Sequence, residues 1–285
     1  MTVPRRNQAT KLLAKSRESD SSDVLPGLSS SSRCSVQPQK MSAPSTETAA
    51  AVPPKALARA KVDLIAWDPE SPAHAERMVQ HRIACGWKQD YIEGWRVLQR
   101  EGKMGLHWVV LSEEDPEKET KLAQHLEKYP GDATPILDTA TALGCKPRSP
   151  SSRSFIPIGH ISLDSESPNP GQADASQGLY CITTLYISRA IHGGGLGRAA
   201  LDATEKMAVN EPLCAKILSL DTLANSSWNR PETWKEIERP EMSAEDWYAR
   251  CGYKAWKYIE GHIQHRDENG KVHPLDGVFM KKTVA

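Results

Sequence analysis

The sequence lacks a net charge, because 36 basic residues balance 36 acidic ones. It therefore gives no sign of the basic surface that would attract nucleic acid or anionic lipid. It also lacks any apolar run approaching the roughly 20 residues that a membrane-spanning helix needs. We therefore expect neither a nucleic-acid partner nor a membrane partner.

Closely spaced cysteines are also missing. The six cysteines lie far apart and none belongs to a Cys-x-x-Cys pair, which argues against a zinc ribbon or a redox motif. No secretory apolar segment precedes them, so we expect reduced thiols in an intracellular protein. The prediction is no metal and a location in the cytoplasm or nucleus.

Aromatic residues are absent from residues 1–58, which are rich in Ser, Pro, Thr and Ala. Such a segment buries too little apolar surface to offset its ordering entropy, so we predict that it is disordered. The basic start resembles a mitochondrial transit peptide, but acidic residues follow from Glu18. Met41 is an alternative start of the chain. We predict one folded domain over residues 59–285.

Apolar spacing in this domain predicts the order β-α-α-β-β-β-α-β-α-β-β over Val62–Val284. This α/β (α+β) pattern indicates a mixed sheet with few helices and not a doubly wound repeat. Two polar stretches interrupt it, and we interpret residues 112–154 and 226–240 as insertions. The first is expected to hold one helix followed by a flexible loop.

A glycine-rich loop, Ile191-His-Gly-Gly-Gly-Leu-Gly-Arg198, joins a predicted strand to a predicted helix. Glycines let the backbone approach an oxygen-rich ligand, and a helix start adds unpaired N–H donors and a positive dipole end. The loop therefore predicts a phosphate or pyrophosphate site, to which Arg198 can add a positive charge.

Two other phosphate-binding patterns compete for this loop. The P-loop is excluded because no Gly-Lys-Ser/Thr follows. Gly195-Leu-Gly197-Arg-Ala-Ala200 does fit the dinucleotide fingerprint, with Asp221 at the end of the next strand. Five residues, Ser188 to His192, nevertheless precede the first glycine, and no second βαβ half follows. An NAD(P)-binding oxidoreductase stays open as an alternative.

A third pattern matches at two places. His192-Gly-Gly-Gly195-Leu-Gly197 resembles the central Gln/Arg-x-x-Gly-x-Gly/Ala motif of the GNAT superfamily of N-acetyltransferases. Asp246-Trp-Tyr248-Ala-Arg-Cys-Gly252-Tyr253 resembles the end of a later helix in that family. The resemblance extends over Val62–Val284 and is weak before Phe155. It implies a GNAT-like, mostly antiparallel sheet of about seven strands flanked by helices, with acetyl-CoA as co-substrate.

The resemblance also implies cofactor contacts. His192 stands where the family has Gln or Arg, and Glu241 stands where the family often has Asn, so Asn225 is the substitute that we predict. The predicted contacts come from a splayed strand, the glycine loop and this asparagine: Leu185, Tyr186, Ile187, His192, Gly193, Gly194, Gly195, Leu196, Gly197, Arg198 and Asn225.

The implied reaction is direct attack of an amine on the thioester. Tyr248 matches the family's general acid, and a phenol with a pKa of about 10 can protonate a departing thiolate. An ordinary core aromatic is the alternative for Tyr248. Asp164, Glu166 and His160 are candidates for the base, on or just after a predicted strand.

The acceptor is expected to be a small-molecule amine or a protein amine, and the oligomeric state is left open. A catalytically silent CoA-binding module that acts through its interactions is the first alternative to an enzyme.

Overall fold

The computed structural model describes residues 60–285, except residues 145, 230–239 and 267–270. The predicted disordered segment 1–58 and most of the predicted insertion 226–240 lie outside the described residues. Within the described part, no helix has both the length and the apolar character needed to cross a membrane.

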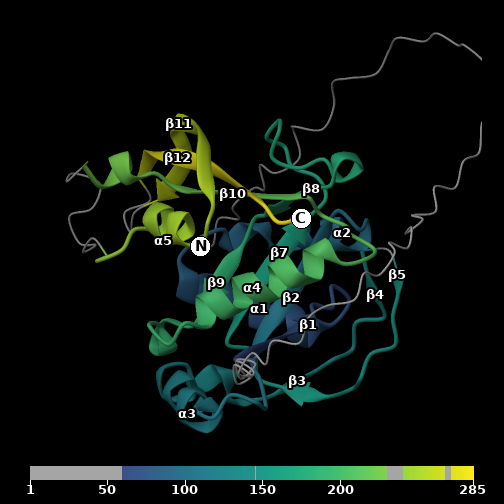
Figure 1. The fold of residues 1–285 in the computed structure, drawn as a ribbon. Helices are drawn as coiled ribbons and strands as arrows, with labels where there is room; N and C mark the ends of the chain where they lie inside the picture. The colour runs from purple at the N-terminus through teal and green to yellow at the C-terminus, as the bar shows by residue number, and fades with distance from the viewer. Residues whose placement is uncertain (1–59, 145, 230–239, 267–270) are drawn as a thin grey trace, which may run out of the picture. The chain divides into compact units, whose positions relative to one another are not determined.

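One sheet carries the fold, with strand order β1-β2-β7-β8-β10-β12-β11 and a further strand, β9, paired with β7 (Figure 1). All its strand pairs are antiparallel except β8–β10. The prediction of a mixed, mostly antiparallel sheet is confirmed. The strands are β1 Val62–Ala66, β2 Met104–Leu111, β7 Gly159–Asp164, β8 Leu179–Ile182, β9 Leu185–Ile187, β10 Ile217–Leu223, β11 Lys254–Arg266 and β12 Val272–Thr283.

Helices cover both faces of this sheet (Figure 1). Successive side chains of β2 point to opposite faces of the sheet. Val109 packs in one hydrophobic core with residues of α4, and Trp108 packs in a second core with residues of α1 and α2. The helices are α1 Pro72–Cys85, α2 Ile92–Arg100, α3 Lys118–Lys128, α4 Leu196–Val209 and α5 Ala244–Arg250. Short 3-10 turns lie at Gln89–Tyr91, Pro130–Ala133, Ala175–Gln177, Arg189–Ile191 and Asn225–Asn229.

Local signals place the ends of α1 and α5. Ser71 caps α1 by accepting a hydrogen bond from the His74 N–H at 3.4 Å, and Gly86 ends the helix with φ 85°. Ser243 caps α5 by accepting from the Asp246 N–H at 3.0 Å. Because the cap fixes the start of α5, it also fixes where Tyr248 lies on that helix.

The stretch 112–154 is more regular than the flexible loop that we expected after its helix. Two short hairpin-like pairs follow α3: β3 Ile136–Leu137 with β6 Ser154–Phe155, and β4 Ala142–Leu143 with β5 Lys146–Pro147. Asp138 holds them, accepting from Arg148 at 2.6 Å and from the Ser151 hydroxyl at 2.7 Å. A buried carboxylate with several donors orders a segment whose apolar pattern predicts no structure.

Candidate acyl-transfer site

The parallel strands β8 and β10 separate in the middle of the sheet. They pair from Leu179 with Ile217 up to Ile182 with Leu220. Beyond that point β9 pairs with β7, whereas β10 continues along β12 to Leu223. The predicted strand Leu179–Ser188 is thus two strands, and a gap opens between β9 and β10.

The alternation of hydrogen bonds shows which backbone groups of β9 face this gap. Ser162 N–H donates to the Thr184 carbonyl at 2.9 Å, and Ser188 N–H donates to the Ile158 carbonyl at 2.8 Å. In an antiparallel ladder every second residue bonds the partner strand, so Tyr186 bonds β7. The N–H and C=O groups of Leu185 and Ile187 therefore point away from β7, toward the gap.

A glycine on β7 permits this arrangement. A Cβ atom on Gly159 would lie 2.1 Å from the Tyr186 carbonyl oxygen. Real Cβ atoms do not approach backbone oxygens so closely, so any larger residue would push β9 away from β7. The position of β9 beside the gap depends on this residue.

The glycine loop lies between β9 and the start of α4. Gly195 is the N-cap residue of α4, with φ 76°, and no side chain caps the helix start. The first-turn N–H groups therefore lack a side-chain partner, which suits an anion at this end. His192 Nε2 donates to the Ile187 carbonyl at 2.9 Å. That bond ties the loop to β9 and leaves the N–H of Ile187 as its donor toward the gap.

Two lysines that sequence reasoning missed lie beside this loop. Lys61 Nζ donates to the Gly194 carbonyl at 3.0 Å, although 133 positions separate the residues. Lys121 also approaches Gly194, but it is paired with Asp115 at 2.6 Å. Arg198, the predicted cation, bonds Asp202 at 2.7 Å and is half exposed. No local sequence signal links Lys61 to the loop, because the contact is made by the tertiary fold.

Tyr248 is partly buried on α5 and packs against the core beneath α4. Burial raises the pKa of its phenol, and the nearby charges of Cys251, Asp221 and Cys181 raise it further. Cys181 is on β8 and Asp221 is on β10, so the phenol lies near the point where these strands separate. The phenol there is therefore neutral and carries its proton.

Asn225 follows β10 and holds the N-terminal end of α5. Its N–H donates to Glu245 at 2.6 Å, and its Nδ2 donates to Asp246 at 3.0 Å. Its Oδ1 is buried without a partner in the part of the chain that the structure describes. Asn225 therefore positions the start of α5, and its contact with the cofactor stays a prediction.

Asp164 ends β7 close to the separation of the strands. Burial raises the pKa of its carboxyl to about 7, against a hydrogen bond from Thr183 Oγ1 at 2.5 Å that lowers it. Its Oδ1 is buried and has no partner among the described residues. Thr183 follows β8 directly, so Asp164 holds the chain where it leaves that strand.

The other two candidate bases lie in different surroundings. Glu166 pairs with Lys103 at 3.4 Å and its side chain is 63% exposed. His160 is completely buried, and burial together with the charges of Arg82 and His81 keeps its pKa well below the usual value. The structure does not bring these two side chains together with Asp164, and it holds His160 in its neutral form.

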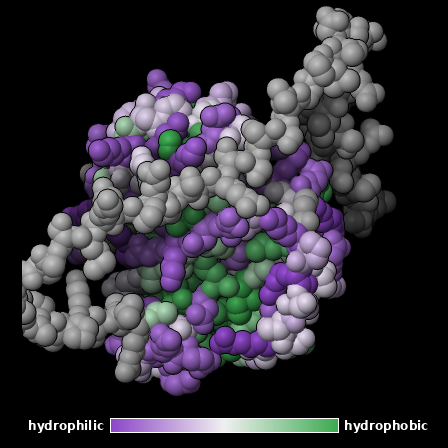
Figure 2. Space-filling model, turned by 45° about the vertical axis from the view of Figure 1, so that its right-hand side comes forward, coloured by the Kyte–Doolittle hydropathy of each residue, from purple (hydrophilic) through white to green (hydrophobic). Residues whose placement is uncertain are grey.

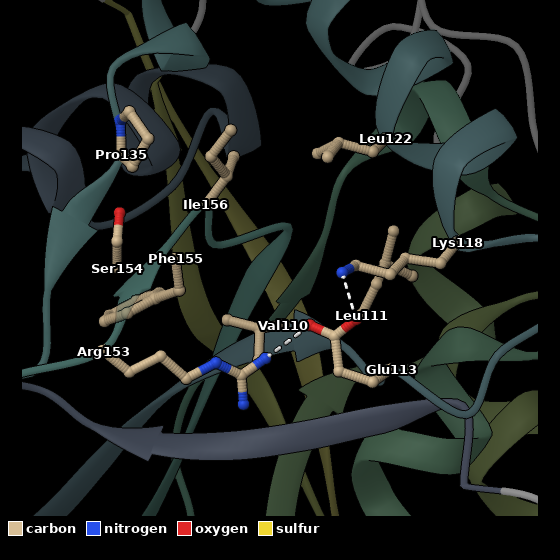
Figure 3. Close-up of a pocket in the computed structure, with 10 residues that line it drawn as sticks. All are labelled: Val110, Leu111, Glu113, Lys118, Leu122, Pro135, Arg153, Ser154, Phe155 and Ile156. Carbon is tan, nitrogen blue, oxygen red and sulfur yellow. Dashed lines mark hydrogen bonds and ion pairs between the residues drawn. The ribbon is translucent and has the colours of Figure 1, made fainter. Parts of the chain in front are cut away.

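Apolar side chains gather in a hollow on the face shown in Figure 2. A pocket of about 200 Å³ between α3, β2 and β6 is bordered by Arg153, Glu113 and Lys118, which form a chain of ion pairs (Figure 3). None of the predicted site residues lines this pocket. Among the described residues, no group of three or more His, Cys, Asp or Glu could hold a metal ion.

No protein-family model matches the sequence, and no curated protein matches it. Among solved structures, the chain is similar to NAA60 of Arabidopsis thaliana in complex with a bisubstrate analogue, at 14% identity and a TM-score of 0.43, covering 79% of this chain and 99% of that one. It is also similar to an aminoglycoside 6'-N-acetyltransferase complexed with coenzyme A, at 11% identity and a TM-score of 0.42, covering 78% and 97%. A third is RimL, a ribosomal L7/L12 alpha-N-protein acetyltransferase, at 8% identity and a TM-score of 0.42, covering 79% and 94%.

Two of the three, RimL and the 6'-N-acetyltransferase, are named as acetyltransferases. At these identities and TM-scores the similarity concerns the fold alone.

Proposed function

We propose that this protein is an acetyl-CoA-dependent N-acetyltransferase. The observation that carries the proposal is the separation of β8 and β10, with the backbone groups of Leu185 and Ile187 directed into the gap. The glycine loop is bonded to Ile187 at the end of β9, and the Tyr248 phenol is within electrostatic reach of Cys181 on β8 and Asp221 on β10. Pyrophosphate, pantetheine arm and thioester of one cofactor molecule would each meet a suitable group.

In this proposal, different residues bind the cofactor and donate the proton. The loop from His192 to Arg198 binds the pyrophosphate through backbone N–H groups, and the edge of β9 pairs with the amide groups of the pantetheine arm. The amine nitrogen attacks the thioester carbon, the carbon–sulfur bond breaks, and the nitrogen gives up its extra proton to a base. Tyr248 gives its proton to the departing thiolate. No covalent enzyme intermediate is needed, so the buried Cys181 and Cys251 need not act as nucleophiles.

The acceptor is an amine of a small molecule or of a protein. Direct transfer requires that the amine reach the thioester from the side of the sheet that α1 and α2 cover, because α4 and α5 occupy the other side. The dinucleotide alternative is less well supported by the fold, since β8–α4–β10 stands alone as a parallel unit in an otherwise antiparallel sheet.

A melting experiment tests cofactor binding without knowledge of the acceptor. A ligand at 100 times its Kd stabilises a protein by about 2.7 kcal/mol, so CoA and acetyl-CoA should raise the melting temperature while NADH and NADPH should not. Gly195→Val should abolish the shift, because Gly195 has φ 76° and a β-branched residue is strained there.

The matched control is Gly131→Ala, since a Cβ atom at Gly131 would meet nothing within 4 Å. Stabilisation by NADPH and not by CoA would contradict the proposal. Turnover on a panel of amines then separates an enzyme from a silent module, which would bind CoA and transfer nothing.

A further inference from the structure

A bulge in β11 presents a histidine on the face of the sheet opposite α4. After a first register shift between Ala255 and Lys257, β11 pairs with β12 from Lys257 with Phe279 to Ile259 with Gly277, and the pairing resumes at Ile263 with Leu275. The extra residues between them include Gly261, with φ 65°, whose N–H donates to Asp276 at 3.2 Å. Bulges re-aim side chains beside active sites, and this one directs His262.

The ring of His262 is closely fitted. It lies 4.8 Å from the Phe279 ring, and a Cβ atom on Gly277 would lie 2.7 Å from its Cδ2. Its Nε2 faces Asp221 Oδ2 at 3.5 Å, while Gln172 Nε2 donates to the other oxygen of Asp221 at 2.6 Å. The carboxylate is thus held in place by an amide and turned toward the imidazole.

This pair lies at the point where the strands separate. Leu220 is the last residue of β10 that pairs with β8, and Asp221 follows it directly. Leu218 and Leu220 belong to the core shared with α4, so Asp221 points to the other face. The side chains of Asp221 and His262 are 19% and 20% exposed, so a ligand can reach them.

We propose that His262, held by Asp221, removes the proton from the acceptor amine in the reaction proposed above. Nε2–H faces the carboxylate, so Nδ1 carries the lone pair that accepts the proton. The amine nitrogen forms its bond to the thioester carbon, the thiolate leaves and takes the Tyr248 proton, and the nitrogen's extra proton passes to Nδ1. Histidine is the side chain whose ordinary pKa best suits this role near neutral pH.

Asp164 is the competing group, and its burial decides against it. Its Oδ1 has no solvent access and its other oxygen is bonded to Thr183, so an amine cannot touch the carboxylate. Three charged groups surround His262. Asp221 on β10 faces its ring, and Lys257 Nζ on β11 lies 5.8 Å from the centre of the Phe279 ring that the imidazole contacts. Asp276 on β12 accepts a hydrogen bond from Gly261 in the bulge.

The first experiment is the pH dependence of kcat, at saturating amine and acetyl-CoA, for wild type, His262→Gln and Asp164→Asn, with any amine that the panel shows to be acetylated. We expect His262→Gln to lower kcat by about 10²-fold or more and to remove the fall in rate on the acidic side. Asp164→Asn should keep that acidic fall, as should the control His273→Gln on the same hairpin. Loss of the acidic fall in Asp164→Asn and its retention in His262→Gln would overturn the proposal.

The second experiment needs no acceptor. Nitrogen-15 NMR of the histidine rings should show His262 with Nε2 protonated and Nδ1 bare above neutral pH, and CoA should shift its signals while leaving those of His273 unchanged. Gly277→Ala, which displaces the ring without removing it, should weaken that response. A His262 signal with Nδ1 protonated, or one unaffected by saturating CoA, would overturn the proposal. Failure of CoA to bind at all would instead contradict the proposed function.

Discussion

Two parts of the same sheet differ in the hydrogen bonding of their polar groups. On the β1–β2 side, two buried polar side chains accept hydrogen bonds from the backbone: Gln99 Oε1 accepts from the Leu106 N–H at 2.9 Å, and His74 Nδ1 accepts from the Asp68 N–H at 2.9 Å. Where β8 and β10 separate, the N–H and C=O groups of Leu185 and the N–H group of Ile187 face a gap.

This difference indicates that the β1–β2 side is a structural scaffold and that the gap between β9 and β10 is the binding site. Hydrogen-bonding groups that are satisfied internally contribute to stability, whereas groups left open at a fixed position are ready for a ligand. Changes on the β1–β2 side should therefore alter the free energy of unfolding, and changes at the gap should alter binding or rate.

The largest effect is expected at Tyr248. Tyr248→Phe removes the proton donor, so kcat should fall by about 10²- to 10⁴-fold while CoA affinity and melting temperature stay close to wild type. Steady-state kinetics and CoA titration measure these. Tyr180→Phe is the matched control, because the Tyr180 hydroxyl bonds the Leu213 carbonyl at 3.2 Å, away from the gap. Equal rates for Tyr248→Phe and wild type would rule out the acid role.

Asp132 is the corresponding test on the scaffold side. It accepts from Arg77 at 3.2 Å and lies 3.1 Å from His125 Nε2, all of them buried. Asp132→Asn leaves the buried guanidinium without its counter-charge and should destabilise the fold by about 3–5 kcal/mol, as measured by urea unfolding. Folded Asp132→Asn protein should still bind CoA. An unchanged midpoint would show that this ion cluster does not hold the scaffold together.

Asp164 gives a pH-dependent prediction. Its pKa is raised by burial to about 7, above the value of the unfolded chain, so the folded state binds more protons than the unfolded state between pH 4 and 7. Stability from this group is therefore present at low pH and lost as pH rises through that range. Relative to wild type, Asp164→Asn should gain up to about 4 kcal/mol between pH 4 and 7, in unfolding curves taken across that range. A constant difference between the two proteins would contradict the burial of an uncharged carboxyl.

The smallest effect in the series is expected at Gly159. Gly159→Ala forces a Cβ atom against the Tyr186 carbonyl and should cost about 1–3 kcal/mol while also weakening CoA binding, because β9 must move. The control is Gly94→Ala in α2, where nothing lies within 4 Å and alanine should stabilise the helix by about 0.5–1 kcal/mol. Calorimetry and CoA titration distinguish the two. Gly159→Ala should lower the free energy of unfolding and Gly94→Ala should raise it. Changes of the same sign would contradict this prediction.

Local signals in the sequence were sufficient for part of the fold. Ser71, Gly86 and Ser243 mark helix ends through their own hydrogen bonds or φ values, so a short window of sequence contains the information. The break after Ile182 is different, because Thr183 and Thr184 have ordinary strand character. It arises from which strand lies alongside, a property of the whole sheet.

The site divides in the same way. The glycine loop and Tyr248 stand in recognisable motifs, and the family resemblance predicted a splayed strand at Leu185–Ile187. The resemblance did not predict that Tyr186 bonds β7 while Leu185 and Ile187 face the gap, because this depends on the register in which β9 pairs with β7. Lys61 and His262 were missed because their contacts with Gly194 and Asp221 join distant parts of the chain.

The central claim is that the open edge of β9 binds the cofactor, and amide hydrogen exchange tests it within one strand. With saturating CoA, exchange of the Leu185 and Ile187 amides should slow strongly. The Tyr186 amide should be protected with or without CoA, because it donates to β7. CoA that binds and leaves the Leu185 and Ile187 amides exchanging as before would contradict the account.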